Sequence, residues 1–115
     1  MPISEIADRY SIILLKSERI EGVDYKDELA AYKAELDKYD GSEAFVKRLY
    51  DVNAIIWDLE SDIRKGKEKL LGLEEVGRRA IAIRENNRTR ISIKNEMVKK
   101  YEEGFEDKKL DNAST

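Results

Sequence analysis

The sequence predicts an all-α protein, a four-helix antiparallel bundle with two long coiled-coil-like helices. Apolar residues recur at spacings of three and four along the chain, and no segment alternates as a half-buried strand would. Glycines fall at the positions where helices are expected to end. Charged and apolar residues each make up 41% of the chain, a mixture typical of long, solvent-exposed helices.

The first two predicted helices are short and end at glycines. The first runs from Ser4, a residue suited to the N-cap, to about residue 21, and Gly22 ends it. Its apolar residues cover more than one face, which predicts a central place in the bundle. The second runs over residues 24–40 and ends at Gly41.

The last two predicted helices are long and form most of the bundle. The third starts after Ser42 and continues to about Leu70, and the fourth runs over residues 74–103. Each would extend about 40 Å at about 1.5 Å per residue, which exceeds what the short helices can cover. We therefore expect self-association, as a homodimer, through these two helices. The helical domain is expected over residues 1–103, followed by a flexible acidic tail over residues 104–115.

The composition excludes several classes of enzyme. The chain has no cysteine and no histidine, so thiol nucleophiles, disulfides, serine–histidine triads and nearly all zinc sites are ruled out. We expect no cofactor and no metal. The start of the chain lacks a basic region followed by an apolar one, and no stretch approaches the roughly 18 apolar residues of a membrane span. These features predict a cytoplasmic protein without a membrane partner.

Positive charge is concentrated in residues 78–100, which carry eight basic and two acidic side chains. The basic residues surround their helix instead of lining one side. We therefore favour ion pairing with the acidic remainder of the chain over nucleic-acid binding, which would also need aromatic residues among the basic ones.

Polar residues interrupt the apolar stripe of the fourth helix. The stripe begins with Val76 and ends with Tyr101, but Asn87, Arg90 and Lys94 occupy its middle. Buried polar groups need partners, because an unpaired charge or amide loses its hydration without compensation. These three side chains therefore predict either an internal polar network or a ligand.

A second stripe of residues on the third helix begins apolar and becomes polar. If the third and fourth helices are antiparallel, the polar part of this stripe lies beside the polar residues of the fourth helix. Arginine, lysine, asparagine and carboxylate groups beside a tryptophan suit a small anionic or phosphorylated ligand. The alternative is a structural network that determines helix register. The candidate ligand-binding residues are Asn53, Trp57, Glu60, Arg64, Asn87, Arg90 and Lys94. The first helix adds Asp8, Lys16, Glu18 and Arg19 as further polar residues.

Two classes of helical enzyme use similar residues. Helical chorismate mutases bind a dicarboxylate with arginine and lysine, although their motif does not align with this chain. Pyrophosphohydrolases of the MazG type hold magnesium with a Glu-Glu-x-x-Glu motif followed by Glu-x-x-Asp. Residues 102–106 match the first string, but the only match to the second, residues 5–8, precedes it. Asp58 and Asp62, four residues apart, are ordinary surface carboxylates that could share a metal.

Three segments resemble a small, all-helical bacterial and phage family of unknown function. They are residues 3–9 with 12–20, residues 49–53 with 57–64, and residues 86–94, and the resemblance spans the chain from residue 3 to about residue 100. Members of that family are often found near genes for cell-surface polysaccharide synthesis, which implies a sugar-related or assembly role. The family supplies no catalytic residues, and the segment after Tyr101 departs from its pattern.

We therefore expect a non-catalytic interaction or small-anion-binding protein, linked to surface polysaccharide or phage biology. The alternative is a small helical enzyme acting on a phosphorylated or sugar-nucleotide ligand.

Overall fold

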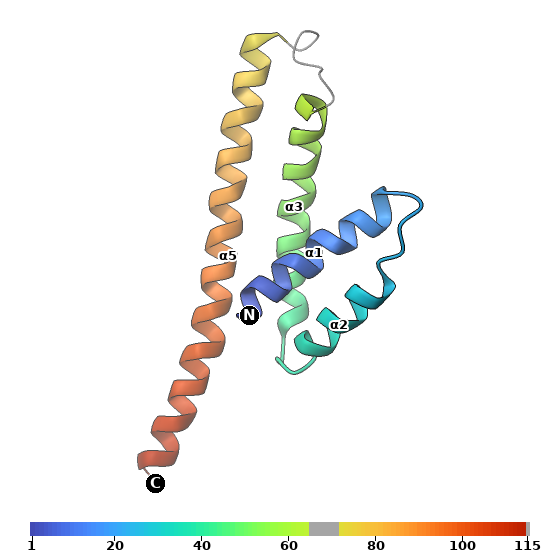
Figure 1. Cartoon of the computed structure of the whole chain (residues 1–115). Coiled ribbons are helices and arrows are strands. Elements are labelled where there is room, and N and C mark those ends of the chain that lie inside the picture. Colours follow the sequence, from blue (N-terminus) through green and yellow to red (C-terminus); the bar gives the residue numbers. More distant parts are fainter. Residues whose placement is uncertain (65–71, 115) are drawn as a thin grey trace.

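A computed structural model of the chain describes residues 1–64 and 72–114, with side chains described up to residue 102 except those of Asp62 and Arg64. Within these residues the backbone forms four helices and no strand, as Figure 1 shows. The helices are α1 (Ile3–Arg19), α2 (Lys26–Leu36), α3 (Ser42–Arg64) and α5 (Leu73–Ser114). The predicted all-α fold class is confirmed.

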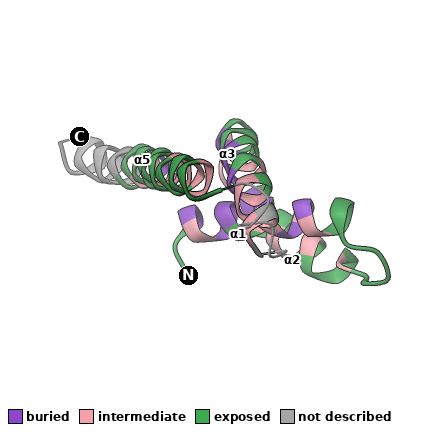
Figure 2. Cartoon of the chain, turned by 90° about the horizontal axis from the view of Figure 1, so that it is seen from above, coloured by how far each residue is buried: buried purple, intermediate pink, exposed green. Residues whose placement is uncertain are grey.

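The two long helices, α3 and α5, lie side by side and form an antiparallel hairpin (Figure 1). Helix α1 crosses this hairpin obliquely and contacts α2, α3 and α5, while α2 packs on α1. Figure 2 shows the same arrangement from above, with the buried residues gathered where α1 meets the hairpin. The central place predicted for the first helix is therefore confirmed.

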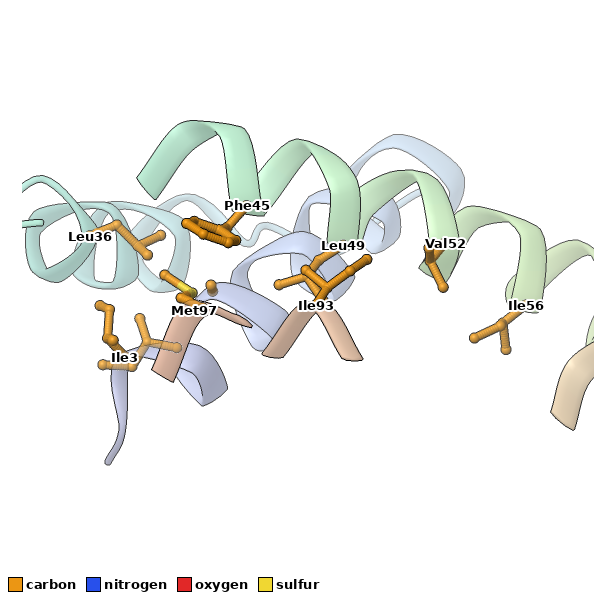
Figure 3. Packing of buried hydrophobic residues seen from close by; sticks show 10 residues of the cluster. Ile3, Leu36, Phe45, Leu49, Val52, Ile56, Ile93 and Met97 are labelled. Atoms are coloured by element: carbon orange, nitrogen blue, oxygen red, sulfur yellow. The ribbon is translucent and has the colours of Figure 1, made fainter. Parts of the chain in front are cut away.

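The apolar core lies where α1, α3 and α5 meet, and one residue of α2 completes it. Leu49 of α3 and Met97 of α5 are fully buried, and in Figure 3 Leu49 lies beside Ile93 of α5 while Met97 lies near Phe45 of α3. Each buried side chain of this size stabilises the fold by about 1.5–3 kcal/mol. The whole cluster consists of Ile3, Ile6, Ala7, Leu36, Phe45, Leu49, Val52, Ile56, Ile93 and Met97.

The ends of the short helices differ from the prediction in detail. Ser4 lies inside α1 and is buried, and Pro2 takes the N-cap position instead. The Ser4 cap was therefore wrong, because proline's restricted φ suits a helix start. Helix α2 ends at Leu36 and not at Asp40.

Glycines do mark the turns. Gly22 and Gly41 follow α1 and α2 with φ of 82° and 78°, values that disfavour side chains with a Cβ. Ser42 begins α3, and its buried hydroxyl donates a hydrogen bond to the Leu36 carbonyl at 2.9 Å.

The fourth predicted helix is longer than expected. It begins at Leu73 and its backbone stays helical to Ser114, beyond the expected end at Glu103. The division into a domain over residues 1–103 and a flexible tail stays a prediction. The expected end of the third helix at Leu70 lies outside the described residues.

Candidate functional site

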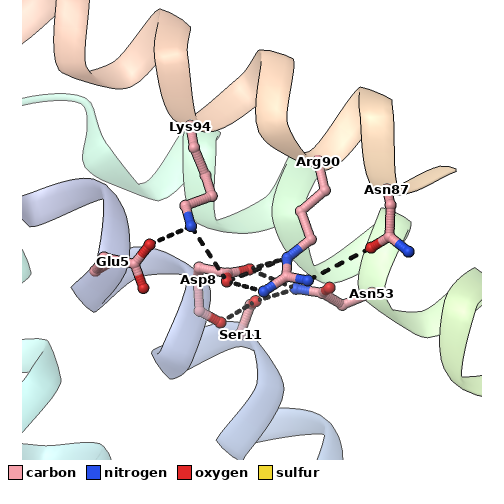
Figure 4. A network of polar contacts seen from close by, with 7 residues as sticks. All are labelled: Glu5, Asp8, Ser11, Asn53, Asn87, Arg90 and Lys94. Atoms are coloured by element: carbon pink, nitrogen blue, oxygen red, sulfur yellow. Dashed lines mark hydrogen bonds and ion pairs between the residues drawn. The ribbon is translucent and has the colours of Figure 1, made fainter. Parts of the chain in front are cut away.

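A buried carboxylate, Asp8 of α1, is the centre of a polar network between α1 and the hairpin (Figure 4). The residue is only 1% exposed. Its carboxylate accepts hydrogen bonds from Arg90 Nε at 3.0 Å and from Arg90 Nη2 on α5. Asn53 Nδ2 on α3 donates to the same carboxylate at 3.0 Å. One carboxylate therefore joins three helices.

Further contacts extend this network on the α1 side. Lys94 Nζ forms an ion pair with Glu5 and lies 3.9 Å from Asp8 Oδ2. Asn53 Nδ2 also donates to Ser11 Oγ at 2.9 Å, and Ser11 Oγ donates to the Asp8 carbonyl oxygen at 2.7 Å. These short polar side chains therefore give Asp8 and Asn53 partners inside the protein.

On the α5 side, Arg90 Nη1 donates to Asn87 Oδ1 at 3.5 Å, the longest hydrogen bond of the cluster. We call the connected residues the Asp8 network. Its members are Glu5, Asp8, Ser11, Asn53, Asn87, Arg90 and Lys94.

The electrostatics of the network keep Asp8 ionised. Burial alone would raise the pKa of Asp8, but hydrogen bonds from Arg90 and Asn53, with the charges of Arg90 and Lys94, lower it below its ordinary value of 3.8. The pKa of Arg90 is raised, chiefly by its hydrogen bonds to Asp8. The pair is therefore charged at neutral pH, as the buried salt bridge requires.

A hollow of about 180 Å³ opens beside the network, between α1, α3 and α5. Ile12, Leu15 and Ile56 supply apolar walls, and Trp57 adds an aromatic one. We call it the Trp57 hollow. Its lining residues are Ile12, Leu15, Asn53, Ile56, Trp57, Glu60, Asn87 and Arg90.

The structure brings most of the predicted site residues together. Four of them belong to the Asp8 network: Asn53, Asn87, Arg90 and Lys94. An internal polar network was one of the two alternatives that the polar stripe predicted. The other two described candidates, Trp57 and Glu60, line the Trp57 hollow with Asn53, Asn87 and Arg90. The side chain of Arg64 lies outside the described residues.

The candidate ligand-binding residues listed from the sequence included none from α1. Asp8 was named as a further polar residue but not as a site residue, and Ser11 was not named. A signal was present, because Ser4, Asp8, Ser11 and Leu15 share one face of α1 at spacings of three and four. A carboxylate between small residues on a buried face indicates an internal partner.

The other polar residues of α1 lie apart from the network. Glu18 accepts a hydrogen bond from the Tyr50 hydroxyl. Arg19 pairs with Asp58 at 2.6 Å, and its guanidinium lies 6.0 Å from the centre of the Trp57 ring. Lys16 lines a separate hollow between α1 and α2. These contacts support the junction of α1 with α3 from the outside.

The basic residues of α5 have partners both within and outside their own helix. Arg78 and Arg79 pair with Glu75 one turn earlier, while Arg90 and Lys94 pair with carboxylates of α1. Ion pairing within the chain, which the sequence favoured over nucleic-acid binding, therefore accounts for these four.

Two of the carboxylates that a MazG-type site would need are paired with cations of the chain itself, and the side chains of residues 103–106 lie outside the described ones. Glu5 and Asp8 face Lys94 and Arg90. Among the residues that the structure describes, no group of three or more metal-binding side chains converges.

Comparisons with protein-family models, curated proteins and solved structures found no match to this chain. Within residues 1–64 and 72–114, no helix combines the length and apolar character needed to cross a membrane.

Proposed function

We propose that the chain is a non-catalytic helical protein that binds a small polar ligand in the Trp57 hollow. One observation carries this proposal. Three polar side chains of the hollow keep hydrogen-bonding groups that nothing else in the described part of the chain occupies: Asn53 Oδ1, Asn87 Nδ2 and the Glu60 carboxylate. Partly buried polar groups of this kind gain most from a ligand that pairs with them.

The Asp8 network has a supporting role in this proposal. It holds α1 against α3 and α5, which together form the walls of the hollow. Because the network connects Asn53 and Arg90 to the same carboxylate, their side chains are held in place before a ligand arrives. Such preorganisation reduces the entropy lost on binding.

A small anion is the second candidate ligand, as the sequence predicted. Arg90 favours it, because this side chain lines the hollow and remains 31% exposed. Arginine presents several N–H donors in one plane, so an edge not used by Asp8 can receive an oxyanion.

The proposal is tested by a thermal-shift screen of the purified chain against phosphate, sulfate, nucleotides, nucleotide sugars, free monosaccharides and magnesium. A ligand at about 100 times its Kd adds about 2.7 kcal/mol, which raises the Tm by several degrees in a domain of this size. Asn87→Phe fills the hollow from α5 and is expected to abolish the shift. Asn95→Phe, at an exposed position of the same helix, is the matched control and should keep it.

A shift that survives in Asn87→Phe would place the ligand elsewhere and refute the Trp57 hollow as the site. A screen without any shift would count against ligand binding and favour a purely structural role for the Asp8 network.

We also propose self-association through the outer side of the hairpin. Ile55 of α3 and Ile81 and Ile91 of α5 are each about half exposed, and contact with a second copy of the chain would remove this apolar surface from water. Sedimentation equilibrium of the wild type and of Ile81→Glu/Ile91→Glu tests this proposal. A monomer in both cases would reject it.

The proposed compartment is the cytoplasm, which fits a chain without cysteine and with 41% charged residues. Membership of the bacterial and phage family, and with it a link to surface polysaccharides, stays a prediction.

A further inference from the structure

Among its described lining residues, the Trp57 hollow has no positive charge left without a carboxylate partner, and this bears on the kind of ligand. The charged residues of its lining are Glu60 and Arg90. Arg90 is paired with Asp8 through two of its nitrogen atoms, and its electrostatic partners also include Glu60. An incoming anion would therefore meet one carboxylate inside the hollow and compete with a second, buried one for Arg90.

The Asp8 network also determines which groups the two amides present. Asn53 uses its nitrogen to donate to Asp8 and Ser11, so its oxygen is left as an acceptor. Asn87 uses its oxygen to accept from Arg90, so its nitrogen is left as a donor, and Figure 4 shows that nitrogen on the side away from Arg90. With the Glu60 carboxylate and the N–H groups of Arg90 that Asp8 does not use, the hollow offers both acceptors and donors. Hydroxyl groups match such a mixed set, because each one both donates and accepts.

The size and walls of the hollow limit the ligand further. Its volume of about 180 Å³ is below the roughly 300–1,000 Å³ of pockets that hold drug-sized molecules. Ile12, Leu15, Ile56 and Trp57 supply an apolar part of the lining beside the polar groups. This combination suits a single ring with one apolar face and polar groups at its edge.

We propose that the ligand of the Trp57 hollow is an uncharged single-ring molecule bearing several hydroxyl groups, with its apolar face against Trp57. This inference rests on the proposed function and adds the class of ligand. Hydroxyl groups of the ring pair with Asn53 Oδ1, Asn87 Nδ2 and Glu60. Arg90 remains paired with Asp8 throughout.

The emission of Trp57 reports on the hollow directly, because it is the only tryptophan of the chain. The probes are myo-inositol, glucose and galactose as uncharged rings, and glucose 6-phosphate, inorganic phosphate and sulfate as anions. We expect saturable changes in emission with the uncharged rings at millimolar concentration, and glucose 6-phosphate to bind at least ten-fold more weakly than glucose.

Two variants separate the ligand classes. Asn87→Leu removes the amide donor and should weaken binding of the uncharged ring at least ten-fold, with the helical circular dichroism unchanged. Glu60→Gln removes the negative charge but keeps the shape, so it should change binding of the uncharged ring by only a few-fold. For an anion, Glu60→Gln would instead increase affinity, because a repulsive charge is lost. Asp51→Asn, an exposed carboxylate on the same helix, is the matched control and should leave both classes unchanged.

The outcomes distinguish the inference from the proposed function. Preferential binding of phosphate, sulfate or glucose 6-phosphate that strengthens in Glu60→Gln would overturn the uncharged ligand while the proposed function stands. An emission change that is identical in wild type and Asn87→Leu would also overturn the inference. No saturable change with any probe would overturn both.

Discussion

Removing Arg90 is the sharpest test of how the Asp8 network stabilises the fold. The change is Arg90→Leu, which keeps an apolar stem on α5 but removes the guanidinium. Asp8 is only 1% exposed in the wild type, and without Arg90 it keeps two nearby donors, Asn53 Nδ2 at 3.0 Å and Lys94 Nζ at 3.9 Å. The carboxylate loses all of its hydrogen bonds from Arg90.

Breaking a buried ion pair from one side typically costs 3–5 kcal/mol. Because Asn53 and Lys94 still face Asp8, and because Arg90 is itself 31% exposed, we expect the lower end, about 3 kcal/mol. Such a loss is a large part of the roughly 5–15 kcal/mol by which a domain of this kind is stable. The double variant Asp8→Leu/Arg90→Leu removes both charges, so it should lie within about 1 kcal/mol of the wild type.

The assay is urea unfolding followed by circular dichroism at neutral pH, with free energies from linear extrapolation. Arg48→Leu is the control, because it breaks an exposed pair, Arg48–Glu96 between α3 and α5, and should cost less than about 1 kcal/mol. If Arg90→Leu is no more costly than Arg48→Leu, the network does not stabilise the fold as argued. A double variant that loses about as much as Arg90→Leu would contradict the paired-charge explanation.

Three further predictions concern the pKa of Asp8, the Asn53 hydrogen bond and the two glycine turns. Because the pKa of Asp8 is lowered in the folded chain, the contribution of its carboxylate to stability should be complete above about pH 5 and disappear as the pH falls through and below 3.8. Urea unfolding of the wild type and Asp8→Asn should therefore give free energies of unfolding that converge in acid. A constant difference down to pH 2 would contradict a lowered pKa of Asp8. Asn53→Leu removes a hydrogen bond to a charged group and should cost about 2 kcal/mol by urea unfolding, whereas no loss would show that Asp8 does not need Asn53. Gly41→Ala and Gly22→Ala, both at φ near 80°, should each lower the stability derived from the Tm by about 1 kcal/mol. The added Cβ at Gly41 would lie 3.0 Å from the Lys100 amine. Similar losses in the two variants would show that this flexible amine moves aside.

Periodicity predicted the helices well because it depends on local spacing. The stripe with Leu49, Val52 and Ile56 on α3 was readable as a buried face, and so was Met97 on α5. The buried Ile93 lies outside the stripe that the sequence predicted for α5. The polar stretch of Asn87, Arg90 and Lys94 was also visible, since hydrophilic residues interrupted an apolar stripe. The helix ends were less accurate, because caps depend on one or two residues, as Pro2 in place of Ser4 illustrates.

The partners of the polar residues were not predictable in the same way. Arg90 and Asp8 are 82 residues apart, and their contact depends on the angle at which α1 crosses the hairpin. Glu5 and Ser11 join the site for the same reason. The spacing of residues along one helix does not determine that crossing angle, because the angle results from packing side chains of α1 against two other helices at once.

The sequence by itself determined that the chain is helical, which faces are apolar, and that three polar residues of the last helix need partners. Those features follow from the period of the α-helix and from the cost of burying an unpaired polar group. Only the tertiary structure decided that Asp8 pairs with Arg90 and that a hollow beside Trp57 retains unused hydrogen-bonding groups. Both depend on where three helices cross, which is set by long-range packing.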